Sequence, residues 1–200
     1  MNAEKTDQKQ GTSWRLFCAF ELPEALRVRI KEHSRRVREA VPEAGASWSR
    51  AESIHLTMKF FGNVDQPRIP AISAPAERVV EEFSAIKIAV GGTGVFPKPN
   101  RPQVLWIGIR DASGALSQLH KRLEDEFARE GFPKEDRAFR PHLTIARIRK
   151  THDASRLAQT HLATKFSEVE ITLDELILFR SELSPKGSKY TAISRHRLEH

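Results

Sequence analysis

The feature that most constrains this chain is a pair of matched tetrapeptides, His55-Leu56-Thr57-Met58 and His142-Leu143-Thr144-Ile145, which lie 87 residues apart. Each stands in an apolar run of strand length. Residues two apart in a strand point to the same face, so each motif presents its histidine and threonine on one side and its apolar residues on the other. The apolar sides must pack against a core. We therefore expect the two His/Thr sides to face a shared cleft.

The same offset relates other parts of the chain. Moving the strand-like run 104–109 back by 87 residues places it on 17–22, and a helical pattern follows each run. Such repetition predicts two halves, about 15–92 and 103–195, related by a pseudo-two-fold axis. The glycine- and proline-rich stretch 91–102 is expected to be a loop between them. The expected fold class is α+β: two pseudo-symmetric lobes, each an antiparallel sheet with helices on its outer face, around a central cleft.

The two ends of the chain are expected to lie outside this fold. Residues 1–13 are polar and lack periodicity, which predicts a disordered leader. Residues 198–200 resemble the remnant of an expression tag. A single bilobal domain then spans residues 14–197.

Composition favours a soluble protein with a polyanionic partner. The 200 residues carry a formal net charge of +7, and a basic excess of this size favours nucleic acid. No apolar run reaches the roughly eighteen residues of a membrane span. Cys18, the one cysteine, excludes an intramolecular disulfide. We expect a cytoplasmic monomer without metal or other cofactor, because the remaining histidines lack paired acidic or thiol ligands.

Two histidines and two threonines across a cleft suit the cleavage of a phosphodiester. Opening a cyclic phosphate needs a base for the attacking water and an acid for the leaving oxygen, and histidine can serve as either near neutrality. The hydroxyls of Thr57 and Thr144 can donate hydrogen bonds to the non-bridging oxygens, where negative charge accumulates. The motifs therefore predict metal-independent acid/base catalysis by His55 and His142.

The chain resembles a known family over roughly residues 15–195. It is similar to the 2H phosphoesterases and, among them, to the bacterial RNA 2′,3′-cyclic phosphodiesterases once named 2′-5′ RNA ligases. The resemblance is carried by six segments, two of which contain the motifs: 15–23, 55–62, 94–97, 101–106, 139–147 and 190–191.

The resemblance implies an activity and a role for each histidine. The activity is hydrolysis of RNA 2′,3′-cyclic phosphodiester ends to 2′-phosphomonoesters, with reversible 2′-5′ ligation as a second reaction. His55 would be the proton donor to the leaving 3′ oxygen, and His142 the proton acceptor that activates water. The reverse direction would exchange the two roles.

Three cations near the motifs are candidates for binding RNA phosphate. Lys59 has the strand parity of His55, and Arg140 has that of His142. Arg147 lies an odd number of residues after His142, so a regular strand would point it away from the His/Thr side. Family resemblance favours a substrate role for Arg147, whereas parity favours solvent unless a twist or bulge intervenes.

Aromatic residues near the motifs are candidates for stacking on a terminal base, as recognition of single-stranded RNA often requires. Phe96, between glycines and prolines on an expected loop, is more open to exposure than the other aromatic candidates. Phe60 and Phe61 are alternatives, although most phenylalanines belong to a core. Trp106 is expected to be packing.

Two other functions are compatible with the sequence. One is an RNA-binding module that keeps the fold without turnover, although both motifs retain the histidine and threonine that catalysis needs. The other is the same chemistry on a small substrate, such as a cyclic-phosphate nucleotide or an ADP-ribose derivative.

Overall fold

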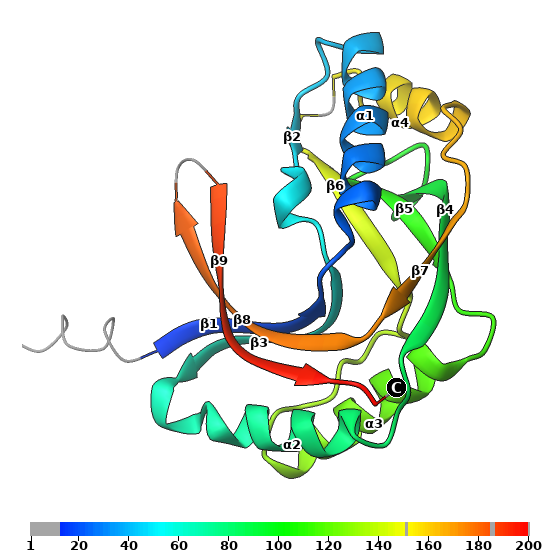
Figure 1. The fold of residues 1–200 in the computed structure, drawn as a ribbon. Coiled ribbons are helices and arrows are strands. Elements are labelled where there is room, and N and C mark those ends of the chain that lie inside the picture. Colours follow the sequence, from blue (N-terminus) through cyan, green and yellow to red (C-terminus); the bar gives the residue numbers. More distant parts are fainter. Residues whose placement is uncertain (1–12, 151, 185–186, 200) are drawn as a thin grey trace, which may run out of the picture.

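The computed structural model describes residues 13–150, 152–184 and 187–199. These residues form two antiparallel sheets with four α-helices on their outer faces (Figure 1). The expected leader lies outside the described residues except for its last member, Ser13, which opens the first strand. Among the described residues, no helix is long and apolar enough to cross a membrane.

The first sheet has the strand order β3-β1-β8-β9, and the second has the order β2-β6-β5-β4-β7. In the first sheet the strands are β1 (Ser13–Phe20), β3 (Leu56–Asp65), β8 (Glu175–Ser184) and β9 (Gly187–Arg197). In the second they are β2 (Ala46–Trp48), β4 (Ile86–Phe96), β5 (Val104–Arg110), β6 (His142–Ile148) and β7 (Val169–Leu173).

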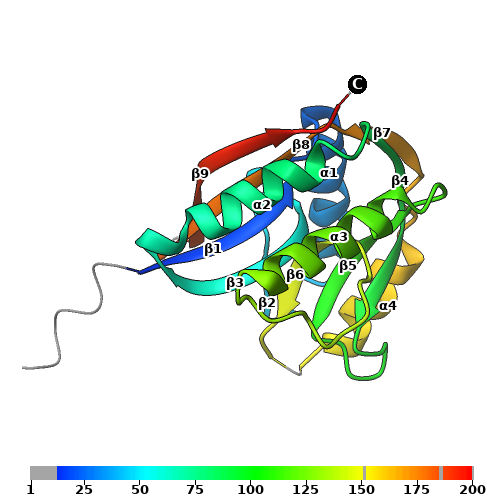
Figure 2. The ribbon, with the colours of Figure 1, turned by 90° about the horizontal axis from the view of Figure 1, so that it is seen from below.

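A pair of helices covers each sheet. α2 (Pro70–Val80) and α3 (Ala115–Arg129) lie side by side under the first sheet (Figure 2), and α2 packs on β8 and β9. α1 (Glu24–Ala40) and α4 (Ala154–Ala163) pack together beside the second sheet. Short 3-10 turns span Ala51–Ser53 and Gln66–Arg68.

The apolar stripe of α3 shows why these helices form and where they pack. Leu116, Leu119, Leu123 and Phe127 recur at helical spacing, and each is at most 1% exposed. Full burial of such a side chain stabilises the fold by about 1.5–3 kcal/mol. The stripe therefore fixes α3 against the core, and the opposite side of the first sheet stays free to line the cleft.

Each sheet combines strands from both halves of the chain. β1 pairs with β8, and β4 pairs with β5. The arrangement of two sheets with outer helices around a cleft is confirmed, but the assignment of each lobe to one contiguous half is wrong. The short connection 97–103 joins β4 and β5 as a hairpin, which fixes β4 in the second sheet.

Two segments expected outside regular structure belong to it. The glycine run 91–94 lies within β4 rather than in a loop, with a register shift between Gly91 and Thr93. At the other end, Leu198 is 3% exposed in the core, and Glu199 donates a backbone hydrogen bond to the carbonyl of Phe83. Leu198 and Glu199 are therefore part of the fold, so the expectation that they lie outside it was wrong.

Candidate active site

His55 lies at the entrance to β3, half-buried against aromatic rings of the first sheet. Its ring stacks on Phe17 at a centroid distance of 4.7 Å and meets the edge of Tyr190 at 5.1 Å. A ring nitrogen donates to the backbone carbonyl of Ser53. Burial lowers the pKa of His55 to about 4, although the bond to Ser53 acts in the opposite direction. In the unliganded protein, this imidazole is therefore neutral at pH 7.

His142 is the first residue of β6 and is held in the same way. Its Nδ1 donates to the backbone carbonyl of Arg140 at 2.7 Å, which leaves Nε2 available for chemistry. Phe96 meets the imidazole edge-on at 5.0 Å, and Trp106 lies at 6.3 Å. In both motifs the carbonyl that accepts this hydrogen bond belongs to the residue two positions before the histidine. The two halves of the chain therefore share the hydrogen bond that orients the imidazole as well as the sequence motif.

Both motif strands contain a bulge one residue after the threonine. In the first sheet Ala19 pairs with Thr57 and Cys18 pairs with Lys59, so Met58 is an extra residue. The second sheet repeats this at Ile145, because Trp106 pairs with Thr144 and Leu105 pairs with Ala146. The two extra residues are 87 positions apart. Beyond each bulge the side-chain parity of the strand is reversed.

The reversal moves Lys59 out of the cleft. Lys59 is 3% exposed, and its Nζ donates to Glu124 Oε1 at 2.6 Å and to the carbonyl of Pro133 at 2.8 Å. Predicting this residue as a cleft cation was wrong, because the parity argument assumed a regular strand. Phe60 takes the cleft position instead: it is 45% exposed and stacks on Phe17 at 5.3 Å.

The equivalent reversal in β6 brings Arg147 to the His/Thr side. Arg147 lies opposite Val104 in the neighbouring strand β5. Val104 and Trp106 are two residues apart and so point to the same side of the sheet, and the Trp106 ring contacts His142 on that side. The side chain of Arg147 is exposed there. The bulge therefore removes the conflict between strand parity and family resemblance.

The other candidates differ in how closely they approach a histidine. Phe96 contacts His142 through its ring, at the end of β4. Arg140 is exposed, and its backbone rather than its guanidinium contacts His142. Thr57 and Thr144 are both half-buried on the side of the sheet that carries their histidines.

Three aromatic residues around His55 were not among the sequence candidates. Phe17, Phe179 and Tyr190 form one cluster on the cleft side of the first sheet, with Phe179 stacked on Phe17 at 5.2 Å. Tyr190 reaches it from β9, which pairs with β8. Because β8 and β9 come from the other half of the chain, only long-range pairing puts Phe179 and Tyr190 beside His55. Trp106 packs as expected and also contacts Phe96.

A short segment connects the two motif strands in space. The amide of Ser49 donates to the carbonyl of Ile145 in β6 at 2.8 Å, and the chain reaches His55 six residues later. Beside His55 is a cavity of about 450 Å³. Within the described part of the chain, no group of three or more histidine, cysteine, aspartate or glutamate side chains is placed to hold a metal ion.

Gly94 provides a test of how the wall behind His142 is packed. A Cβ atom at this position would overlap the indole of Trp106, which also contacts Phe96. We expect Gly94→Ala to lower the free energy of unfolding by about 1–3 kcal/mol, as overpacked positions do. Urea unfolding would measure it. The control is Ser117→Ala, at an exposed position of α3 away from this wall; equal losses in both variants would contradict this account of the wall.

Two antiparallel sheets that carry paired His-x-Thr motifs define a two-histidine phosphoesterase fold. The chain belongs to the 2′-5′ RNA ligase superfamily, whose sequence model matches residues 23–185. It is 32% identical to an RNA 2′,3′-cyclic phosphodiesterase of Methanothermobacter thermautotrophicus, over 92% of this chain and 98% of that protein. It is 28% identical to the Escherichia coli protein of the same name, over 90% of this chain and 94% of that protein.

Solved structures show the same architecture. TT0787 of Thermus thermophilus superposes with a TM-score of 0.73 at 28% identity, over 92% of this chain and 97% of that one. E. coli LigT complexed with NADP+ superposes with a TM-score of 0.72 at 27% identity, over 95% of this chain and 100% of that one. The fold expected from the sequence is thus confirmed by proteins related along nearly their whole length.

Proposed function

We propose that this protein hydrolyses 2′,3′-cyclic phosphate ends of RNA to 2′-phosphomonoesters, with reversible 2′-5′ ligation, in which a 5′-hydroxyl attacks in place of water, as a second reaction. One observation carries the proposal: two imidazoles at equivalent positions of a duplicated fold are each oriented by the carbonyl two residues earlier. Each is followed by a threonine on the same side of its strand. The relatives named RNA 2′,3′-cyclic phosphodiesterase support a cyclic phosphodiesterase activity on RNA.

In the proposed reaction the two imidazoles act on opposite sides of the phosphorus. Nε2 of His142 takes a proton from water as the water oxygen bonds to phosphorus. The bond from phosphorus to the 3′ oxygen breaks, and His55 gives its proton to that oxygen. The phosphate remains on the 2′ oxygen. Solvent then removes the proton from His142 and returns one to His55.

The donor role of His55 requires a change in its protonation when substrate binds. Burial holds the pKa of this imidazole at about 4 in the unliganded protein, where it has no proton to give at pH 7. A phosphodiester anion placed beside the ring favours the charged imidazolium and raises the pKa. Substrate binding thus supplies the condition under which His55 acts as an acid.

Neighbouring side chains have roles in holding the substrate. The hydroxyls of Thr57 and Thr144 donate to the non-bridging oxygens as negative charge develops. Arg147, on the same side as His142, adds a positive charge, and Arg140 contributes an exposed cation at the entrance to β6. Phe96 offers a ring on which the terminal base can stack.

Three further properties are predicted from the sequence. The protein turns over substrate without a metal, acts as a monomer and is located in the cytoplasm. The same site on a small nucleotide is the alternative substrate, and a binding module without turnover is the alternative function.

The test is product analysis with an oligonucleotide that ends in a 2′,3′-cyclic phosphate, in the presence of a chelator. We expect rapid conversion to a 2′-phosphate and no loss of rate on chelation. Accumulation of a 3′-phosphate would contradict the assigned leaving group. Binding without hydrolysis would favour the RNA-binding module.

A further inference from the structure

We infer that the cavity beside His55 is a subsite for the phosphodiester on the 5′ side of the terminal nucleoside, and that it makes RNA chains better substrates than mononucleotides. The inference rests on the proposed function and adds a specificity-determining site to it. None of the residues proposed above for catalysis lines this cavity except His55.

The cavity opens directly from the reacting centre. It has a volume of about 450 Å³, and His55 forms part of its wall. The other walls come from the segment between β1 and α1, the first turn of α1, the 3-10 turn before His55, and the start of β9. Phe179 and Tyr190 supply aromatic surface beside the imidazole.

The wall of this cavity carries three cations and two carboxylates. Arg27, Arg50 and Lys189 line it, together with the carboxylates Glu21 and Glu52. Glu21 is partly neutralised from outside the cavity, because Arg195 approaches it at 3.7 Å.

The three cations are free to bind an anion. Arg50 donates to the carbonyl of Ser188 at 2.7 Å, which fixes its guanidinium between the 3-10 turn and β9 without cancelling its charge. Among the described residues, neither Arg27 nor Lys189 forms an ion pair with a carboxylate. An anionic group entering this cavity therefore meets positive charge that no fixed carboxylate of the wall has paired.

The direction of the substrate follows from the proposed chemistry. The leaving 3′ oxygen faces His55, and C3′ of the ribose is bonded to C4′, which carries C5′ and the preceding phosphate. The RNA chain therefore continues on the His55 side of the scissile phosphate. The next anion along the chain lies where Arg27, Arg50 and Lys189 are gathered.

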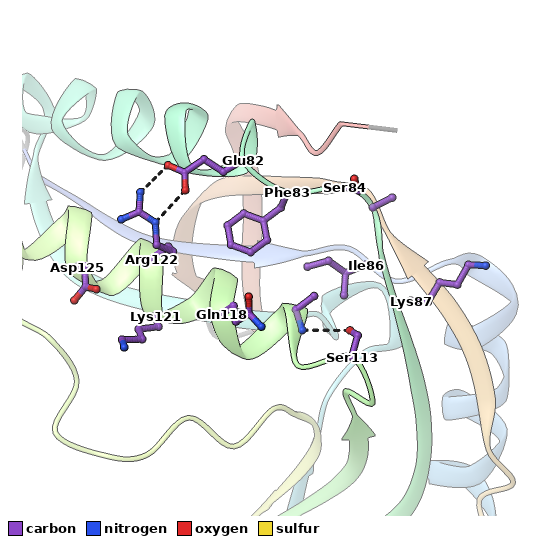
Figure 3. A pocket seen from close by; sticks show the side chains of 12 residues that line it. Glu82, Phe83, Ser84, Ile86, Lys87, Ser113, Gln118, Lys121, Arg122 and Asp125 are labelled. Atoms are coloured by element: carbon purple, nitrogen blue, oxygen red, sulfur yellow. Dashed lines mark hydrogen bonds and ion pairs between the residues drawn. The ribbon is translucent and has the colours of Figure 1, made fainter.

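A larger hollow on the outer face does not have this character. It has a volume of about 820 Å³ and lies between the end of α2 and α3 (Figure 3). Its guanidinium, on Arg122, is already held by both carboxylate oxygens of Glu82, at 2.6 and 3.0 Å. Lys87, which also lines this hollow, provides a cation outside the proposed RNA path.

The experiment compares adenosine 2′,3′-cyclic phosphate with a diadenosine dinucleotide that ends in the same group. We expect the wild-type kcat/KM to be higher for the dinucleotide. Lys189→Ala and Arg27→Ala should each lower that value about three- to tenfold, in keeping with a charged hydrogen bond, and change the mononucleotide value less than about twofold. Each lost phosphate contact should reduce the salt slope of dinucleotide binding by about 0.7.

Lys87→Ala is the matched control and should leave both substrates unaffected. Equal losses on both substrates would overturn the subsite, because the cations would then act on the scissile phosphate or on the fold. Unchanged rates on both substrates would overturn it as well. If the wild-type protein hydrolysed neither substrate, the proposed function itself would fail, and the subsite with it.

Discussion

Replacing either His55 or His142 with alanine is expected to lower kcat on a 2′,3′-cyclic phosphate end by about a hundred- to ten-thousand-fold. In the proposed reaction each imidazole moves a proton in the step that breaks or forms a bond to phosphorus. Single-turnover rates with an oligonucleotide would measure the loss, and circular dichroism would confirm folding. The control is His152→Ala, because His152 is exposed beside Asp153. Near wild-type turnover in either motif variant would rule out the two-histidine mechanism.

A modified substrate separates the donor from the acceptor. Sulfur in place of the bridging 3′ oxygen gives a thiolate leaving group, which departs without needing a proton. If His55 is the donor, His55→Ala should regain most of its rate on this substrate, whereas His142→Ala should stay slow. Selective rescue of His142→Ala would instead assign the donor role to His142, and would agree with the low pKa of His55 in the unliganded protein.

Much of this site was predictable from the sequence because its chemistry is repeated. The offset of 87 residues located both histidines, and strand parity placed Thr57 and Thr144 on the same side as their histidines. Exchange of strands between the halves was not predictable in this way. Periodicity describes a strand but not its partner, so nothing in the local pattern of β4 or β8 shows which sheet it joins.

The two bulges mark where parity alone fails. Met58 and Ile145 are ordinary apolar residues, and neither carries the glycine that often accompanies a bulge. Each bulge puts two consecutive residues on the core side, Met58 with Lys59 and Ile145 with Ala146. A lysine that follows an apolar run is normally predicted to point from the strand into solvent. Here its burial depends on a carboxylate 65 residues away, on α3.

Lys59→Met is expected to lower the free energy of unfolding by about 3–5 kcal/mol, because it leaves Glu124 buried without its ammonium partner. Glu124 is 6% exposed, and its second oxygen accepts the amide of Glu135 at 2.8 Å, so it cannot turn to solvent without losing that bond. Urea unfolding would measure the loss.

The double variant Lys59→Met/Glu124→Leu should recover much of that stability, because it removes both buried charges and refills the space with apolar atoms. The recovery should be incomplete, since the carbonyl of Pro133 and the amide of Glu135 each lose a partner. Activity per folded molecule should stay near wild type in both variants. A stable Lys59→Met protein with weakened RNA binding would instead place this ammonium in the cleft, where a regular strand would have put it.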